Sequence, residues 1–421
     1  MSIENVETLI IGGGQAGLAM SHMLKQRGRP HLILERYRIA ERWRTERWDG
    51  LRFQFPNWSV GLPDFPFPHT DADGFATTSD ILDYIAAYAA FVAPPIRCGV
   101  SVTALRHRDG ASDFVVETCE GPIEAANVVV ATGPYQRAVV PALFREDVSG
   151  FQMHASRYTN PDQLPAGTVL VIGSGASGAQ ITEELFRSGR LVYLSVGQHS
   201  RLPRRYRGRD LMWWFGALGL LQMPAQKRGP IRKHPAITGA YGGHTIDFRR
   251  FAADGVTLLG RAEAMHDGVM RFAPDVADSL ANGDAIYATF LDMADDHVKR
   301  HSLEMPDDPA ARETLPDPPC LVEPLRRLDF RDAGIGAVIW ATGYSFDFSW
   351  IDLPVLNARG EAVHRRGVTD VAGLYFLGLP WLSNMNSSFL SGVGDDAARV
   401  ADHIVKRVVP AAASLTAKSS P

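Results

Sequence analysis

The chain has 421 residues, of which 45% are hydrophobic and 21% are charged, and its formal net charge is -4. This length predicts two or three domains with buried cores. The weak negative charge favours neither nucleic acid nor an anionic membrane as a partner. No stretch approaches the roughly 18 apolar residues that span a bilayer, and we expect no secretory leader. Cys98, Cys119 and Cys320 form no CxxC motif, so we expect a reduced cytoplasmic protein with no metal site and no redox disulfide.

The first elements are typical of a nucleotide-binding unit. Thr8–Ile11 reads as a strand, Ala16–Arg27 as a helix and His31–Glu35 as a second strand, with a glycine turn after the first strand. Residues 36–75 are rich in Trp, Phe and Pro and predict a long packed loop.

A helix and three strands follow this loop. The segment "TTSDILDYIAAYAAFV" has apolar residues at helical spacing and N-cap candidates at Ser79 and Asp80. The alternating stretches "VSVTALRH" and "FVVETC" predict a strand pair. The segment "NVVVATG" at 127–133 predicts a buried strand that ends in a turn of small residues.

The second half of the sequence repeats these patterns of strands, turns and helices. A second strand–turn–helix–strand unit begins at residue 169 and ends near Val196. Residues 274–320 are acidic and rich in proline, with a helix expected at 284–301. The segment "AVIWATGY" at 337–344 repeats the strand and small-residue ending of 127–133, and a last helix is expected at about 393–407.

The first glycine turn is Gly12-x-Gly14-x-x-Gly17. In this fingerprint the first glycine permits a tight turn, the second lets the backbone approach a pyrophosphate, and the third lets the helix pack on the strand. The phosphates lie at the helix N-terminus, where free N–H groups and the helix dipole favour negative charge. Glu35 ends the second strand and is placed to bind ribose hydroxyls. Because an acid there disfavours a 2′-phosphate, we expect FAD or NAD at this turn.

The second glycine turn is Gly173-x-Gly175-x-x-Gly178, with Ser174 and Ser177 between the glycines. It comes after a strand and opens a helix, as the first turn does, so it also predicts a dinucleotide site.

The strand after the second turn, "RLVYLSV", ends without an acid, and Gln198 and His199 come next. The missing acid is compatible with the 2′-phosphate of NADP, while Gln198 and His199 could bind either a phosphate or a free ribose. The choice between NADPH and NADH therefore stays open. A basic run could hold a phosphate or could be a solvated face: Arg201, Arg204, Arg205, Arg207 and Arg209.

Two turns with different endings predict two different dinucleotides, a flavin at the first and a nicotinamide at the second, with hydride passing between them. The expected fold is α/β, with two Rossmann-like dinucleotide-binding domains. Residues 1–150 and 321–421 form the FAD domain in this division. Residues 151–320 form the NAD(P) domain, with a helical and acidic insertion at about 274–320.

The segment "VSGFQMHASRYTNP" at 148–161 resembles the fingerprint F-x-G-x-x-x-H-x-x-x-W of class B flavin-dependent monooxygenases. These are the flavin-containing monooxygenases and their Baeyer–Villiger relatives. Gly150, His154 and Tyr158 match its spacing, whereas the first position is Val148 instead of Phe. The Tyr ending is similar to the flavin-containing monooxygenase branch. The Gln198–His199 pair resembles small bacterial members that accept NADH as well as NADPH.

The resemblance implies an enzyme that holds FAD tightly and uses NADPH, NADH or both as an exchangeable donor. One oxygen atom of O2 would pass from a C4a-(hydro)peroxyflavin to a small organic substrate, most simply at nitrogen or sulfur. The alternatives are Baeyer–Villiger oxygenation of a ketone and an uncoupled NAD(P)H oxidase or flavin reductase. A homodimer is one conceivable assembly.

The resemblance also selects site residues. The family usually has an Asn near the flavin in a segment matching "LRFQFPNW", where Gln54 falls by position and Asn57 is the alternative. His154 is the third catalytic candidate, although a role in linking the domains suits it better. The expected cofactor-binding residues are Gly12, Gly14, Gly17, Glu35, Arg42, Trp43, Thr132, Gly133, Gly173, Ser174, Gly175, Ser177, Gly178, Gln198, His199, Arg201, Thr342, Gly343 and Asp395. The expected substrate-cavity residues are Trp213, Trp214, Trp381, Asn384 and Asn386.

Overall fold

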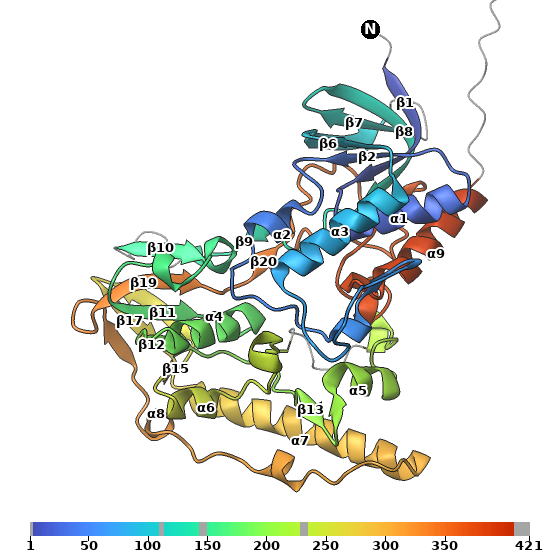
Figure 1. The fold of residues 1–421 in the computed structure, drawn as a ribbon. Coiled ribbons are helices and arrows are strands. Elements are labelled where there is room, and N and C mark those ends of the chain that lie inside the picture. Colours follow the sequence, from blue (N-terminus) through green and yellow to red (C-terminus); the bar gives the residue numbers. More distant parts are fainter. Residues whose placement is uncertain (1–2, 109–112, 143–149, 228–234, 408–421) are drawn as a thin grey trace, which may run out of the picture.

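The computed structural model describes residues 3–108, 113–142, 150–227 and 235–407. It contains two α/β units, each built around its own sheet (Figure 1). This arrangement confirms the expected fold class.

The first sheet has seven strands in the order β5-β2-β1-β8-β7-β6, with β21 also pairing with β8. The long strand β8 pairs in parallel with β1, and its first half pairs with β7 in antiparallel orientation. Its second half pairs in parallel with β21. The predicted strand pair and the predicted buried strand are therefore confirmed. The bounds are β1 Glu4–Ile11, β2 Leu32–Glu35, β5 Ile96–Cys98, β6 Val102–His107, β7 Phe114–Thr118, β8 Gly121–Val130 and β21 Leu374–Phe376.

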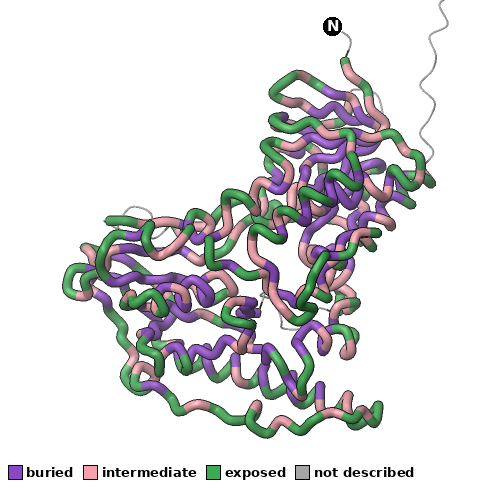
Figure 2. The backbone as a smooth tube through the Cα atoms, viewed as in Figure 1, coloured by how far each residue is buried: buried purple, intermediate pink, exposed green. Residues whose placement is uncertain are grey.

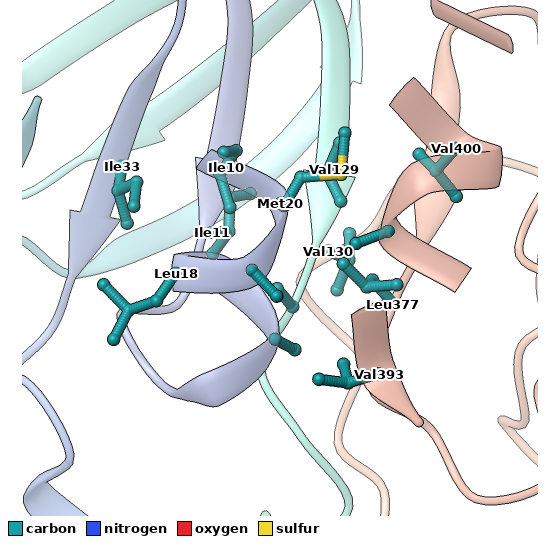
Figure 3. Close-up of a cluster of buried hydrophobic side chains, with 14 of the residues drawn as sticks. Ile10, Ile11, Leu18, Met20, Ile33, Val129, Val130, Leu377, Val393 and Val400 are labelled. Carbon is teal, nitrogen blue, oxygen red and sulfur yellow. The ribbon is translucent and has the colours of Figure 1, made fainter. Parts of the chain in front are cut away.

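Three helices cover this sheet: α1 (Gln15–Gln26), α3 (Thr78–Val92) and α9 (Val393–Lys406). Strand β1 ends in a continuous buried run, as expected for a parallel strand covered on both faces. Ile10, Met20 and Val129 meet Val400 between the sheet and the helices α1 and α9 (Figure 3). Thr77 caps α3 in a capping box with Asp80, which is the third residue of the helix, so the expected caps Ser79 and Asp80 are wrong.

The second sheet is wholly parallel, in the order β10-β19-β11-β12-β15. Strand β19 lies between β10 and β11, although the sequence division placed residues 321–421 in the first domain. If the two units are divided by strand pairing, β19 belongs to the second unit, and the chain returns to the first unit after Trp340. The bounds are β10 Phe151–His154, β11 Thr168–Ile172, β12 Val192–Ser195, β15 Thr257–Leu259 and β19 Ile335–Trp340, with helices α4 Ala176–Arg187 and α6 Phe248–Ala253.

The long helix α7 (Val276–His301) runs beneath the second unit towards α5 (Leu211–Ala217) (Figure 1). Helix α7 begins at Val276, before residue 284, where the sequence pattern placed its start. Buried residues occupy the centre of each unit (Figure 2). Every described helix is too short or too polar to cross a bilayer. The remaining short elements are α2 Glu41–Thr45, α8 Pro319–Val322, β3 Gly61–Leu62, β4 Phe65–Pro66, β9 Arg137–Ala138, β13 Arg205–Tyr206, β14 Arg209–Asp210, β16 Ala262–His266, β17 Val269–Phe272, β18 Arg327–Asp329 and β20 Tyr344–Ser345.

Candidate functional site

A cavity of about 1580 Å³ runs between the two units and is lined by both glycine turns. It is therefore one continuous space at the carboxyl ends of β1 and β11, where open parallel sheets bind ligands. The expected cofactor residues on its wall are Gly12, Gly14, Glu35, Arg42, Trp43, Thr132, Gly133, Gly173, Ser174, Gly175, Ser177, Gln198, His199, Thr342 and Gly343.

The first glycine turn has the geometry that a phosphate cradle requires. Gly12 has a φ of +116°, and a Cβ there would lie 2.6 Å from the carbonyl oxygen of Ala131. A Cβ on Gly17 would lie 1.9 Å from the carbonyl oxygen of Gly12, whereas one on Gly14 would meet no heavy atom within 4 Å. The first and third glycines are thus required by backbone packing. The second faces open space in the cavity, which fits a pyrophosphate at the N-terminus of α1.

The second turn repeats this geometry. Gly173 has a φ of +108°, and a Cβ there would lie 2.5 Å from the carbonyl oxygen of Ala341. A Cβ on Gly178 would lie 1.8 Å from the carbonyl oxygen of Gly173, and one on Gly175 would meet nothing within 4 Å. Both turns therefore fit a dinucleotide, and helix α4 presents its N-terminus at the second one.

The two glycine turns differ at the carboxyl end of the strand beside each of them, β2 for the first turn and β12 for the second. The N–H of Gly12 donates to the carbonyl of Leu34, and that of Gly173 donates to the carbonyl of Ser195. Glu35 comes directly after the first of these contacts, whereas an apolar valine comes after the second. The Glu35 carboxylate accepts hydrogen bonds from the N–H groups of Gly13, at 2.7 Å, and Tyr37, at 2.9 Å. Of the two turns, the first therefore has a carboxylate on the residue that follows this contact, where it can bind a ribose, and the second has none there.

Gln198 and His199 both line the cavity beside the second turn. His199 is only 8% exposed, and its ring packs against Phe248 at 4.7 Å between centroids. Its Nδ1 lies 3.2 Å from the carbonyl oxygen of Gly197, and burial lowers its pKa. A neutral, packed imidazole is a weaker partner for a phosphate than a cationic one.

The arginines of the basic run after His199 all have partners within the protein, and three of them form ion pairs. Arg201 binds Asp247 and Asp284 at 2.7 and 2.8 Å and does not line the cavity. Its side chain is 11% exposed. The other four arginines also have partners within the protein: Arg204 binds Asp210, Arg205 the carbonyls of Gly242 and Gly243, Arg207 the acids Asp295 and Asp307, and Arg209 lies over the ring of Trp213.

His154 contacts the second of the two "ATG" turns. Gly133 and Gly343 each end an "ATG" segment with a positive φ, of 73° and 81°. His154 Nδ1 accepts a hydrogen bond from the N–H of Ser156, so Nε2 carries the proton that it shares with the Gly343 carbonyl at 3.0 Å. Burial lowers the pKa of this imidazole. These contacts make His154 a neutral side chain that binds the second "ATG" turn, and His154 also lines the cavity.

The structure separates the two candidates of the "LRFQFPNW" segment. Gln54 lines the cavity, and its backbone carbonyl accepts a hydrogen bond from Arg204. Asn57 does not line the cavity, because its amide nitrogen donates to the carbonyl of Asp71. Trp43, which also lines the cavity, packs on Phe53 at 6.0 Å.

Arg42 lies on the cavity wall and joins two segments of the first unit. Its guanidinium binds Glu46 at 2.6 Å and the carbonyl of Gln136 at 3.2 Å. Gln136 in turn donates to Thr132 and to the Gly133 carbonyl, so Arg42 supports the first "ATG" turn.

The cavity becomes apolar around Gln54. Phe55 contacts Phe53 and Phe389, with ring centroids 5.7 and 4.7 Å apart, and all three lie on the wall. Of the residues expected to surround a substrate, Trp381 lines the cavity, while Trp213, Trp214, Asn384 and Asn386 do not. The apolar wall also includes Phe215, Ile237, Met385 and Leu390. Met385 and Leu390 belong to one segment, and Phe215 and Ile237 come from two others, so no single local pattern reveals this wall.

Several expected residues lie away from the cavity wall. Gly17 and Gly178 lie behind the turns as packing positions. Asp395 is in the first turn of α9 but does not line the cavity. Tyr158 is buried at 1% exposure, and Val148 lies outside the described residues.

The described part of the cavity wall includes no cysteine. All three cysteines are in the described part of the chain, and none lines the cavity. Among the described residues, no cluster of three or more His, Cys, Asp or Glu is arranged to hold a metal ion.

Residues 9–208 match the family model described as pyridine nucleotide-disulphide oxidoreductase. An uncharacterized oxidoreductase called CzcO-like, from Geobacillus kaustophilus, is 36% identical over 397 residues, which are 93% of this chain and 96% of that protein. The indole-3-pyruvate monooxygenase YUCCA8 of Oryza sativa subsp. indica is 33% identical over 215 residues, 48% of this chain and 50% of that protein.

Solved structures share the fold. A flavin-containing monooxygenase from Stenotrophomonas maltophilia has a TM-score of 0.66 at 20% identity and covers 96% of this chain and 99% of its own. The ornithine N-hydroxylase of Kutzneria sp. 744, solved with reduced FAD, NADP+ and L-ornithine, has a TM-score of 0.60 at 16% identity, with coverage of 96% and 99%. The resemblance stated from the sequence is confirmed. The chain belongs to the CzcO-like oxidoreductases.

Proposed function

We propose that the protein is an FAD-dependent NAD(P)H:oxygen monooxygenase that adds one oxygen atom to a nitrogen or sulfur atom of a small organic substrate. The observation that carries the proposal is the continuous cavity, which joins two phosphate-binding turns to an apolar end. In this assignment FAD occupies the turn with Glu35, and the nicotinamide dinucleotide occupies the turn that lacks the acid.

The chain's own residues supply binding, orientation and a dry site. FAD, when bound, supplies hydride acceptance and oxygen activation. The N–H groups at the N-termini of helices α1 and α4 would bind the two pyrophosphates, and Glu35 would bind the flavin's ribose. The rings of Phe55 and Phe389 exclude water around Gln54, whose amide can donate a hydrogen bond to a reacting oxygen.

The choice of a heteroatom substrate rests on the resemblance to the flavin-containing monooxygenase branch, through Tyr158. The apolar wall favours a small substrate that is mostly apolar or aromatic. Baeyer–Villiger oxygenation is the alternative with the same cofactors. An uncoupled oxidase is a second alternative, in which the reduced oxygen leaves as hydrogen peroxide.

One experiment separates these three reactions. The FAD-loaded protein is mixed in air with NADPH or NADH and with methyl phenyl sulfide, N,N-dimethylaniline or phenylacetone. Consumption of NAD(P)H, release of hydrogen peroxide and product mass are measured together. We expect one sulfoxide or N-oxide and one water for each NAD(P)H and O2 consumed. An ester from the ketone alone would assign the Baeyer–Villiger reaction. Peroxide equal to all the NAD(P)H oxidised, with every substrate, would overturn the monooxygenase assignment.

A further inference from the structure

The second glycine turn lacks a free cation from the basic run that comes after it in the sequence. Arg201, the nearest arginine of that run, is bound by two carboxylates and does not line the cavity. His199 is packed and its pKa is lowered. A 2′-phosphate at this turn therefore needs a positive charge from elsewhere in the fold.

Strand pairing brings such a charge to the turn. Strand β15 runs parallel to β12, with Leu259 opposite Ser195. The hydroxyl of Ser195 donates to the carbonyl of Gly260 at 2.9 Å. Arg261 therefore leaves the sheet beside the segment that carries Gln198, and both residues line the cavity. This is the edge at which the second dinucleotide's ribose would lie, because it matches the edge of β2 that carries Glu35.

The guanidinium of Arg261 is held more loosely than that of Arg201. Its side chain is 70% exposed, and its Nε lies 3.7 Å from the carboxylate of Asp275. The corresponding distance is 2.7 Å for Arg201 with Asp247. An arginine held this loosely can turn its planar fork towards a phosphate at small cost.

We propose that Arg261 recognises the 2′-phosphate of NADPH and so determines the preference for NADPH over NADH. The inference rests on the proposed function in placing the nicotinamide dinucleotide at the second turn. Asp275, which also lines the cavity, accepts a hydrogen bond from the N–H of Arg261 at 2.9 Å. Its negative charge opposes the phosphate, so the preference is moderate and NADH remains a donor.

The test uses fragments that carry the phosphate difference and no redox chemistry. The FAD-loaded protein is titrated in a calorimeter with 2′,5′-ADP and with 5′-ADP. We expect Arg261→Ala to weaken 2′,5′-ADP binding about tenfold or more, the size of one charge-assisted hydrogen bond, and to change 5′-ADP binding less than about twofold. Arg261→Lys keeps part of the affinity. Asp275→Asn strengthens 2′,5′-ADP binding.

Arg271→Ala is the matched control, because Arg271 is an exposed arginine on β17 that does not line the cavity. It removes the same charge and leaves the ratio of the two affinities unchanged. The proposal is overturned if Arg261→Ala alters both affinities equally or neither, or if Arg271→Ala gives the same loss. If the wild-type protein binds neither nucleotide, the placement of the dinucleotide fails and the proposed function fails with it. The protein could instead prefer 2′,5′-ADP to 5′-ADP through Arg261 and yet oxygenate no substrate. That result would overturn the proposed reaction and leave the role of Arg261 intact.

Discussion

The carbonyl oxygen of Gly173 lies 1.8 Å from the position that a Cβ on Gly178 would occupy. The same relationship holds in the first turn, where the distance from the Gly12 oxygen to a Cβ on Gly17 is 1.9 Å. The third glycine of each turn is thus required by the fold. Gly175 has no atom near its missing side chain, so any constraint there comes from a ligand.

Two substitutions in the second glycine turn should therefore affect different properties, one the stability and the other the binding of NADP+. Gly178→Ala is expected to lower the free energy of unfolding by about 1–3 kcal/mol, the usual cost of overpacking. Gly175→Ala is expected to leave the thermal midpoint unchanged and to weaken NADP+ binding, because its methyl group enters the space for the pyrophosphate. Thermal unfolding and calorimetric titration with NADP+ measure the two effects. Unaltered NADP+ binding by Gly175→Ala would contradict a phosphate at this turn.

Replacement of Glu35 tests the first site. Glu35→Gln removes the charge and one of the two acceptor oxygens that bind Gly13 and Tyr37. We expect FAD affinity to fall about tenfold, the size of one hydrogen bond to a charged group. Glu41→Gln is the control, since Glu41 also lines the cavity but pairs with Arg38. The ratio of FAD to protein after purification, and reconstitution followed by flavin fluorescence, measure both variants. Equal loss of FAD from the two variants would argue against a ribose contact at Glu35.

The neutral state of His154 predicts a pH dependence of stability. Because burial lowers the folded-state pKa, the unfolded chain binds the proton first as the pH falls below about 6.5, and stability decreases. His154→Gln keeps a donor for the Gly343 carbonyl but cannot titrate. As the pH is lowered from about 7 to about 5, we expect the thermal midpoint of His154→Gln to fall less steeply than that of the wild type. The difference in slope corresponds to at most one proton taken up on unfolding. His31, His199 and His364 have lowered pKa values too, so some slope remains. A variant with the wild-type slope would show that His154 is not neutral in the folded protein.

The same variant separates a linking role from general acid–base catalysis. If His154 only holds the Gly343 carbonyl, His154→Gln keeps its turnover and its pH profile for oxygenation. A general acid or base would instead lose about a hundredfold or more in rate.

The local order of both nucleotide-binding turns could be predicted from the sequence, because glycine spacing and apolar strands are short-range signals. Two other features could not. Gly283 lies inside helix α7, although glycine disfavours helices; a Cβ there would lie 2.6 Å from His199 Nε2, so packing explains it. Strand β19 is mostly buried, so its apolar sequence is compatible with a place in either sheet. Only its pairing with β11 shows that it belongs to the second unit.

The arginines show the same limit within the site. The run from Arg201 to Arg209 is visible as a basic segment, but the partners of Arg201, Arg205 and Arg207 are distant in the sequence. Asp247 and Asp284 reach Arg201 only after the chain has folded. Arg261, isolated in the sequence, lies at the cavity through the pairing of β15 with β12.

The cysteines provide a test against thiol–disulfide chemistry, which the name of the matched family suggests. None of them lines the cavity, so a chain with Cys98→Ser, Cys119→Ser and Cys320→Ala should keep its rate of NADPH oxidation and its product yield within about twofold. Cys320 is half-buried, so the thermal midpoint is measured alongside. A tenfold loss of activity at an unchanged midpoint would place a thiol in the reaction.

Gln54 and Asn57 form a matched pair for testing the apolar end of the cavity. Gln54 lines the cavity, whereas Asn57 lies three positions further along the same segment and binds the Asp71 carbonyl. We expect Gln54→Ala to keep NADPH oxidation within about threefold while most of the consumed oxygen is released as hydrogen peroxide, because loss of one hydrogen bond can slow transfer about tenfold. Gln54→Asn, with a shorter amide, should fall between this variant and the wild type. Asn57→Ala should cost about 1 kcal/mol of stability and leave the ratio of peroxide to product unchanged. Peroxide release and product yield, measured in the same reaction, decide the assignment: uncoupling by Asn57→Ala but not by Gln54→Ala would transfer the role to Asn57.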